Sequence, residues 1–200
     1  MRSAVAEEIV NIAKKTGVLR PRDLEAHGIA RKYLSLLCNE GVLKRVGRGL
    51  YIRADAEISS DIGLAQVAKQ VPQGIVCLLS ALQFHNIGTQ SPFEVWLAID
   101  RKAWRPQIDY PPIRIMRFSG EALTEGIEKH AIERVSVRIY SPAKTVADCF
   151  KYRNKIGLDV AIEALRDCRD SKKCTNADLW KYAKVCRVTQ VMKPYLEALL

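Results

Sequence analysis

The chain has 200 residues, which suits one large domain or two small ones. Its hydrophobic content of 48% is ordinary for a globular protein that buries a real core. The net charge of +10 favours polyanionic partners, because Lys and Arg attract phosphate. The longest apolar run, residues 75–79, is far too short to span a bilayer, so we expect no membrane partner.

The positive charge is concentrated near the N-terminus. Residues 1–53 hold 11 Lys and Arg against 5 Asp and Glu, a net charge of +6. Residues 54–200 hold 21 against 17, a net charge of +4. About a quarter of the chain therefore carries more than half of the surplus, which places the expected nucleic-acid contacts in the first 53 residues.

The six cysteines are scattered and form no C-x-x-C pair, and no His lies at ligand spacing from one. This pattern argues against a zinc site and fits a reducing cytoplasm better than a disulfide framework. Cys77 and Cys149 lie in apolar runs and are expected to be buried. No glycine-rich phosphate loop is present. We therefore expect a cytoplasmic protein with no metal and no cofactor.

The first 54 residues predict a winged helix-turn-helix domain. Val5, Ile9 and Ile12 recur at helical spacing, Pro21 opens a short second helix, and Gly41 ends a third helix over 30–40. Strands over 42–46 and 50–53 follow, with Gly47-Arg48-Gly49 at the tip of the hairpin. In such a domain the third helix enters the major groove of DNA and the hairpin, or wing, approaches the backbone.

Basic and amide side chains fall where this domain would need them. Arg and Lys suit guanine, and Asn suits adenine, in the major groove. An arginine at the wing tip suits a narrow minor groove. The alternatives are a merely solvated face or a winged helix that binds protein. The predicted DNA-binding residues are Arg20, Arg22, Arg31, Lys32, Ser35, Asn39, Lys44, Arg45, Arg48 and Arg53.

Residues 55–200 predict a mixed α+β domain that ends in helices, so the fold class is α+β. Alternating patterns indicate three strands, a stretch with three prolines indicates a loop, and helical spacing dominates the ends. Expected strands are 93–99, 113–118 and 135–140, the loop is 104–112, and the helices are 60–70, 75–85, 143–152, 158–170, 176–186 and 191–200.

Four polar residues stand within apolar segments of this second domain. In a functional interpretation, Ser80 and His85 would act as nucleophile and base, or Lys144 and Asp148 would bind a phosphate or a metal ion. Positions 80 and 85 lie about 140° apart around a helix, which disfavours the first pair. We favour structural roles, with Ser80 bonded to its own helix, His85 at a helix end, and Lys144–Asp148 as a surface ion pair. No catalytic residue is predicted.

A basic cluster of Lys151, Arg153 and Lys155 lies beside Tyr152. It would be either a solvated face or a second contact with nucleic acid. The sequence leaves both interpretations open.

The chain resembles the antitoxins of the AbiE abortive-infection system, which are classed as type IV toxin–antitoxin systems. The residues LCNEGVLKRVGRGLYIR resemble the end of that family's winged helix. Further matching stretches cover 71–100, 111–118 and 140–167, and the segments Ser80–His85 and Lys144–Asp148 are the most distinctive. The resemblance covers most of residues 5–170.

The resemblance implies two roles. The N-terminal domain would bind inverted repeats of double-stranded DNA in its own promoter and repress it, as a monomer or weak dimer that binds cooperatively. The second domain would neutralise a nucleotidyltransferase-like toxin without a stable complex. The alternatives are an atypical protein kinase that acts on the toxin, or a plain regulator with no toxin. Residues singled out for toxin neutralisation are Ser80, His85, Lys144, Asp148, Lys151 and Arg153.

Overall fold

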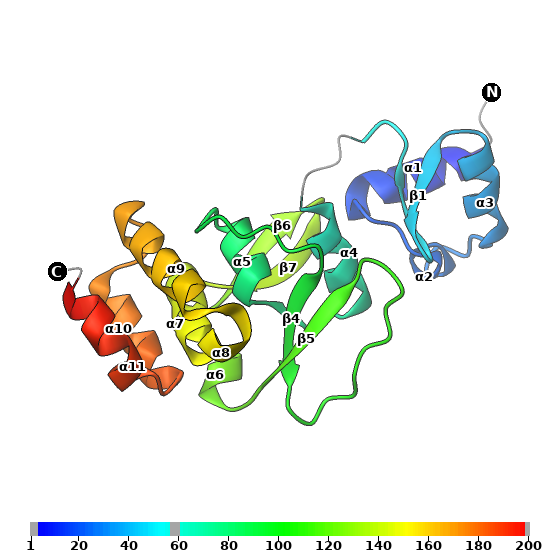
Figure 1. Cartoon of the computed structure of the whole chain (residues 1–200). Helices are drawn as coiled ribbons and strands as arrows, with labels where there is room; N and C mark the ends of the chain where they lie inside the picture. Colours follow the sequence, from blue (N-terminus) through cyan, green and yellow to red (C-terminus); the bar gives the residue numbers. More distant parts are fainter. Residues whose placement is uncertain (1–3, 57–60, 199–200) are drawn as a thin grey trace. The chain divides into compact units, whose positions relative to one another are not determined.

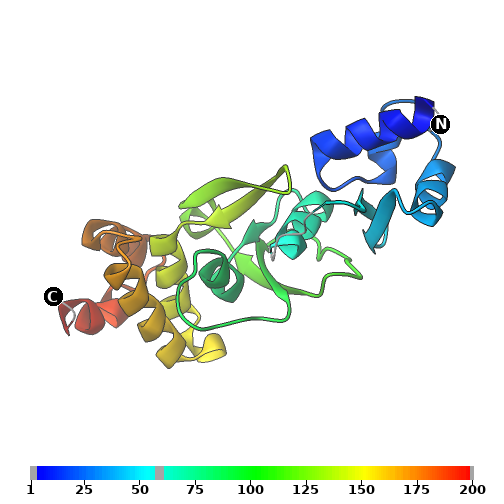
Figure 2. The same ribbon diagram turned by 90° about the horizontal axis from the view of Figure 1, so that it is seen from above.

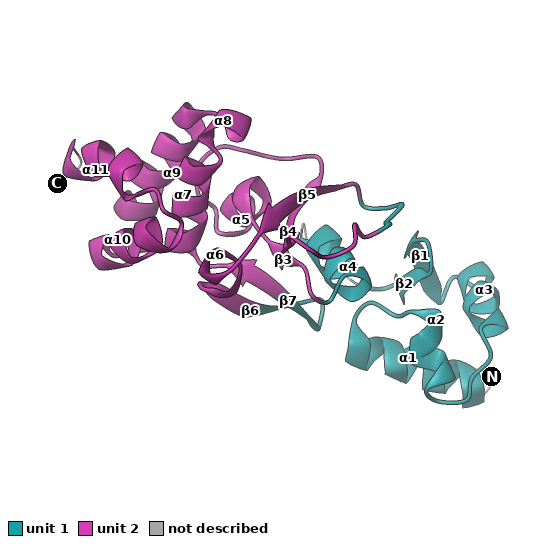
Figure 3. Cartoon of the chain, turned by 90° about the horizontal axis from the view of Figure 1, so that it is seen from below, with its two compact units in different colours: residues 1–72, 107–111, 130–137 teal, residues 73–106, 112–129, 138–200 magenta. Residues whose placement is uncertain are grey.

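A computed structural model describes residues 4–56 and 61–198 and confirms the predicted α+β fold (Figure 1). The chain forms two compact units (Figure 3). Unit 1 comprises residues 1–72, 107–111 and 130–137, and unit 2 comprises the rest. Residues 57–60 lie outside the described residues, and so does the start of the helix predicted over 60–70.

The N-terminal part of unit 1 has the element order of a winged helix, as predicted. Gly17 and Gly41 take positive φ angles of 67° and 69°, which end the first and third helices. Pro21 stands in the first turn of the second helix, as expected. The elements are α1 (Ala4–Thr16), α2 (Pro21–Glu25), α3 (Lys32–Asn39), β1 (Leu43–Gly47), β2 (Leu50–Arg53) and, after the gap, α4 (Ile62–Gln70).

A short backbone bridge that the sequence pattern did not indicate completes the winged helix. The Tyr51 N–H donates to the Leu19 carbonyl at 2.9 Å, and the Leu19 N–H donates back at 2.8 Å. Leu19 therefore adds to the β1–β2 hairpin from the stretch between α1 and α2. The helices and the hairpin share a core of buried residues, in which Ile9, Leu24 and Leu37 are almost wholly excluded from solvent.

A five-stranded mixed sheet, with order β5-β4-β3-β7-β6, forms the centre of the rest of the chain. Strand β3 pairs antiparallel with β4 and parallel with β7, and β4 runs parallel to β5 at one edge. Two of the three predicted strands have their expected bounds, and the third begins two residues later. The strands are β3 (Ile75–Val76), β4 (Val95–Asp100), β5 (Ile113–Phe118), β6 (Ile127–Ile132) and β7 (Val135–Tyr140).

The prediction of one helix over 75–85 is wrong at its start. Ile75 and Val76 form the central strand β3, and only then does α5 (Leu78–Phe84) begin. β-Branched residues fit a sheet interior, and a five-residue apolar run cannot by itself distinguish a buried strand from a buried helix. Strand β6 and the short helices α6 (Glu121–Thr124) and α8 (Arg153–Ile156) were also missed by the sequence pattern.

Helix α7 (Pro142–Lys151) is the hub of unit 2. It packs against α5, α8, α9 (Leu158–Asp170), α10 (Asn176–Val185) and α11 (Thr189–Ala198). Eight consecutive residues, 143–150, are buried, so α7 has no solvent-facing stripe along that length. Figure 2 shows helices α7 to α11, coloured from yellow to red, gathered beside the sheet. Among the described residues, none of the helices is both long and apolar enough to cross a membrane.

Candidate nucleic-acid interface

Helix α3 presents a continuous exposed face to solvent. Lys32, Ser35, Leu36 and Asn39 are all exposed, and their spacing places them on one side of the helix. The opposite side holds Leu34 and Leu37 in the core of the winged helix. Burial of these two leucines therefore fixes which side chains point outward.

Arg31 lies just before this face, at the N-cap position of α3. Its Nε donates to Glu25 Oε1 at 2.5 Å, while 71% of the Arg31 side chain and 46% of the Glu25 side chain remain exposed. An exposed ion pair contributes little to stability, so a phosphate can replace the Glu25 carboxylate at small cost.

The wing carries three exposed cations. Lys44 and Arg45 lie on β1, and Arg45 Nε donates to the Gly47 carbonyl at 3.2 Å across an irregularity in the strand register. Arg48 stands at the tip, with 81% of its side chain exposed, and Gly49 beside it has a φ of 67°. The positive φ favours glycine there and lets the tip turn tightly.

The wing tip also meets an acidic residue of unit 1 that lies far away in the sequence. Arg48 Nη1 donates to Asp109 Oδ2 at 2.9 Å, and this bond raises the pKa of the guanidinium. The neighbouring Tyr110 carbonyl accepts from Gln70 Nε2 at 3.1 Å, which ties the segment 107–111 to α4. Any other anion that binds Arg48 would therefore compete with the Asp109 carboxylate.

The other three predicted DNA-binding residues have different surroundings. Arg22 is exposed. Arg53 is paired with Asp55 and keeps 29% of its side chain exposed. Arg20 donates to the Lys69 carbonyl at 2.5 Å and lies 3.3 Å from Asp23, with only 18% exposed. Its guanidinium therefore holds α2 and the end of α4 together.

In unit 2, Ser80 and His85 bind different strands. Ser80 Oγ accepts from the Trp96 N–H at 2.9 Å, which links α5 to β4, so the expected bond to its own helix is wrong. His85 does stand at the end of α5, but its Nε2 lies 2.8 Å from the Tyr140 carbonyl of β7. A carbonyl only accepts, so Nε2 is the donor. His85 is thus the C-cap residue of α5, as expected, and the Lys173 Nζ lies 2.6 Å from its carbonyl.

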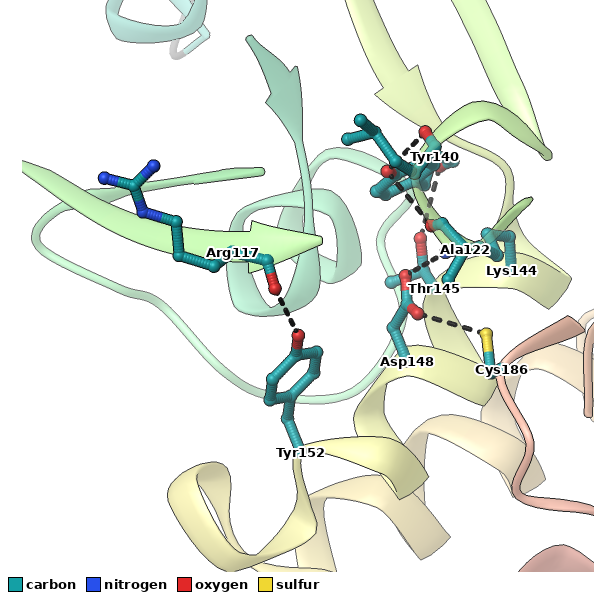
Figure 4. Close-up of polar contacts among 9 residues, drawn as sticks. Arg117, Ala122, Tyr140, Lys144, Thr145, Asp148, Tyr152 and Cys186 are labelled. Atoms are coloured by element: carbon teal, nitrogen blue, oxygen red, sulfur yellow. Dashed lines mark hydrogen bonds and ion pairs between the residues drawn. The ribbon is translucent and has the colours of Figure 1, made fainter. Parts of the chain in front are cut away.

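Lys144 and Asp148 form the expected ion pair, at 2.6 Å, but its predicted surface location is wrong. Both side chains are fully buried. Figure 4 shows them with Cys186 and Tyr140 close by. The Cys186 thiol donates to the second Asp148 oxygen at 3.2 Å, and the Lys144 ammonium lies 3.9 Å from the Tyr140 ring centroid. Burial raises the pKa of Asp148, although Lys144 opposes the shift.

The cysteines predicted to be buried, Cys77 and Cys149, are fully buried, and burial raises the pKa of both thiols. The basic cluster Lys151, Arg153 and Lys155 surrounds the short turn between α7 and α8. Lys155 is exposed, and the other two are half-buried.

Sequence reasoning missed two residues of the winged-helix surface. Leu36 was not assigned to the outer face of α3, because an isolated apolar residue there carries no charge signal; it is 49% exposed. Asp109 lies 61 residues from Arg48, and no local pattern links the two.

The comparisons with known proteins agree with this geometry. Residues 7–54 match the family described as "Transcriptional regulator, AbiEi antitoxin". The winged helix is therefore similar to that of the AbiEi antitoxins. The resemblance expected from the sequence is thereby confirmed over this segment. No curated protein matches the chain significantly.

The fold as a whole has a known counterpart. A crystal structure of the RV2827C protein from Mycobacterium tuberculosis has a TM-score of 0.65 to this chain at 12% identity. The similarity covers 98% of this chain and 78% of that one. At this level of identity the likeness concerns the fold alone.

The Arg48–Asp109 pair yields a prediction about DNA affinity. Asp109→Asn should strengthen binding to duplex DNA about two- to fivefold at low salt, because an exposed ion pair that competes with phosphate is removed. Fluorescence anisotropy with labelled duplex measures the change. Glu197→Gln alters net charge equally but lies on α11, and should change nothing. A gain that persists in Arg48→Ala/Asp109→Asn would contradict the interpretation.

The buried pair yields a prediction about stability. Lys144→Met should lower the free energy of unfolding by about 3–5 kcal/mol, because it leaves a buried carboxylate without a counter-charge. The double variant Lys144→Met/Asp148→Leu should lose far less than the sum of the single changes. Urea unfolding measures both.

The matched control for Lys144→Met is Lys193→Met. Lys193 forms an exposed pair of the same i,i+4 spacing with Glu197, at 3.7 Å, and should contribute below about 0.5 kcal/mol. Equal losses for Lys144→Met and Lys193→Met would show that the buried pair has no special role.

Proposed function

We propose that the chain is a transcriptional autorepressor and the antitoxin of a type IV toxin–antitoxin system. Its winged helix would bind inverted repeats in its own promoter. The observation that carries the proposal is the coincidence of the family match with exposed cations on both α3 and the wing. Neither element alone is specific, since charged helix faces and winged helices are both common.

The proposed division of labour follows from the surroundings of each residue. Lys32, Ser35, Leu36 and Asn39 would face base edges, because they share the exposed side of α3. Residues proposed for phosphate or minor-groove contacts are Arg22, Arg31, Lys44, Arg45, Arg48 and Arg53. Arg20 would position α2 rather than touch DNA, since its guanidinium is already bonded within unit 1.

The second half of the proposal concerns a nucleotidyltransferase-like toxin. Residues 55–200 would neutralise it functionally, without a stable complex. Lys144, Asp148 and Ser80 are buried, so they would act by shaping this region rather than by touching a partner. Lys151 and Arg153 would be the candidates for direct contact. Coexpression with such a toxin tests this half: growth rescue by the full chain supports it, and unrelieved toxicity opposes it.

A mobility shift on the chain's own upstream DNA tests the first half. Selective binding over scrambled DNA that survives higher salt would support base readout. Equal binding to both, lost as salt rises, would mean phosphate attraction alone and would contradict autorepression.

The wing tip should contribute one cationic contact. Arg48→Ala should weaken operator binding and reduce the slope of log affinity against log salt by about 1, because one phosphate contact and its released counterion are lost. Anisotropy at several salt concentrations measures both quantities. An unchanged affinity and slope at moderate salt would remove the wing tip from the interface.

Leu36 should read a thymine methyl group, because it is the one large apolar side chain on the exposed face of α3. Replacing operator thymines one at a time by deoxyuracil should cost about fourfold at one position, the value of one buried methyl. Leu36→Ala should bind more weakly and lose that sensitivity. Sensitivity that persists in Leu36→Ala would assign the methyl contact to another residue.

A further inference from the structure

A surface hollow of about 420 Å³ lies along the edge strand β5 of unit 2. Its position follows from topology: β4 and β5 are parallel, so the chain must return past the sheet edge between them. The hollow is lined by Glu94, Arg105, Ile113, Arg114, Ile115 and Arg117. We call the hollow, together with residues 101–105, the β5-edge surface.

Cations outnumber carboxylates on this surface. Arg101, Lys102 and Arg105 are exposed, and no carboxylate partner for them lies among the described residues. The acidic residue of this surface, Glu94, pairs with Arg114 at 2.5 Å, and Asp100, which directly precedes residues 101–105, accepts the Lys102 backbone N–H at 2.7 Å. The surface therefore keeps a net positive charge that suits a phosphate backbone.

Two aromatic side chains adjoin the lining residues and are almost fully solvated. Trp104 precedes Arg105 and is 96% exposed, and Phe93 precedes Glu94 and is 85% exposed. By contrast, Trp96 on β4 is 4% exposed, under the Arg114 guanidinium at 4.7 Å. Large aromatic rings held in water favour a partner with flat apolar faces.

The turn that presents Trp104 is already ordered. Arg117 Nη1 donates to the carbonyls of Asp100, Arg101 and Ala103, two of them at 3.1 and 3.2 Å. The Arg101 N–H donates to the Phe118 carbonyl at 2.8 Å. An ordered turn lowers the entropy lost on binding, because the ring is fixed beforehand.

The basic cluster on α7 and α8 adjoins the same strand. The Tyr152 hydroxyl donates to the Arg117 carbonyl at 3.0 Å, which fixes this turn against the end of β5 (Figure 4). Lys155 lies 5.9 Å from the Tyr152 ring centroid. The positive surface therefore continues from the hollow to the α7–α8 turn.

We propose that the β5-edge surface binds single-stranded nucleic acid, with a base stacked on Trp104 and the backbone on Arg101, Lys102 and Arg105. Stacked aromatics combined with a basic groove are the features by which proteins hold single strands without base pairing. A duplex would hide its base faces and leave Trp104 unused. An acidic peptide would match the charge but not the two exposed rings. The proposal is independent of the winged helix and its operator.

Intrinsic tryptophan fluorescence of the full chain tests the proposal. Trp104 is the exposed tryptophan, since Trp96 is buried and Trp180 is half-buried. Oligo-U and oligo-dT of about 12 nucleotides, and a duplex of equal length without operator sequence, are titrated separately at about 50 mM salt. We expect quenching by one or both single strands. A preference for oligo-U over oligo-dT would identify RNA.

Labelled strands and anisotropy then locate the site. Trp104→Ala should weaken strand binding roughly 5- to 100-fold, whereas Trp104→Phe, which keeps a stacking ring, should stay within about threefold. Arg105→Gln should reduce the salt slope by about 0.7. Arg48→Ala should leave strand binding unchanged, and Trp104→Ala should leave operator binding unchanged.

Three results would overturn the proposal. These are no quenching by either strand, strand binding that survives both Trp104→Ala and Arg105→Gln, and quenching by the duplex alone. The last would make the β5-edge surface an extension of a duplex-binding footprint. Because operator binding is measured separately, failure here is distinguishable from failure of autorepression.

Discussion

The interaction on which unit 2 depends is the buried ion pair between Lys144 and Asp148. Both charges lie on α7, the helix that packs against α5, α8, α9, α10 and α11. A helix buried on every side must neutralise any charge it carries within the core. The pair meets this constraint at 2.6 Å, with the Cys186 thiol and the Tyr140 ring completing its surroundings. A buried pair is weak evidence of net stabilisation, but losing one partner is costly because the other charge is left buried without a counter-charge.

Positive charge is concentrated on two different surfaces of this protein. On the winged helix, cations share an exposed face with Ser35, Leu36 and Asn39, which suits a duplex whose base edges are read from a groove. On the β5-edge surface, cations stand beside exposed aromatic rings, which suits unpaired bases. Charge alone would not separate these surfaces. The neighbouring uncharged side chains distinguish the two surfaces, because they determine which part of a nucleic acid each surface can contact.

Local patterns predicted most of the fold, and their failures share one cause. Helix bounds were close where proline opened or glycine ended a helical run, as at Pro21 and Gly41. The stretch 75–85 was assigned to one helix, but its first residues became the central strand β3. Two residues cannot show a period of two, and their pairing partners lie far along the chain, at Ala98 and Leu97 on β4 and Ile139 on β7. Ser80 likewise received a partner on its own helix, whereas its hydroxyl binds β4.

The sequence by itself determined the α+β class, the order of the winged helix and the identity of its cationic residues, because helix periodicity, glycine placement and charge are local properties. Only the tertiary structure decided which charged groups remain free. It buried Lys144 and Asp148, bonded Arg20 to the end of α4, and placed Asp109 against the wing tip. It also left Trp104 in water beside a row of arginines. The solvent exposure and the ion-pair partner of a charged side chain depend on residues distant in the chain, so no local sequence pattern predicts them.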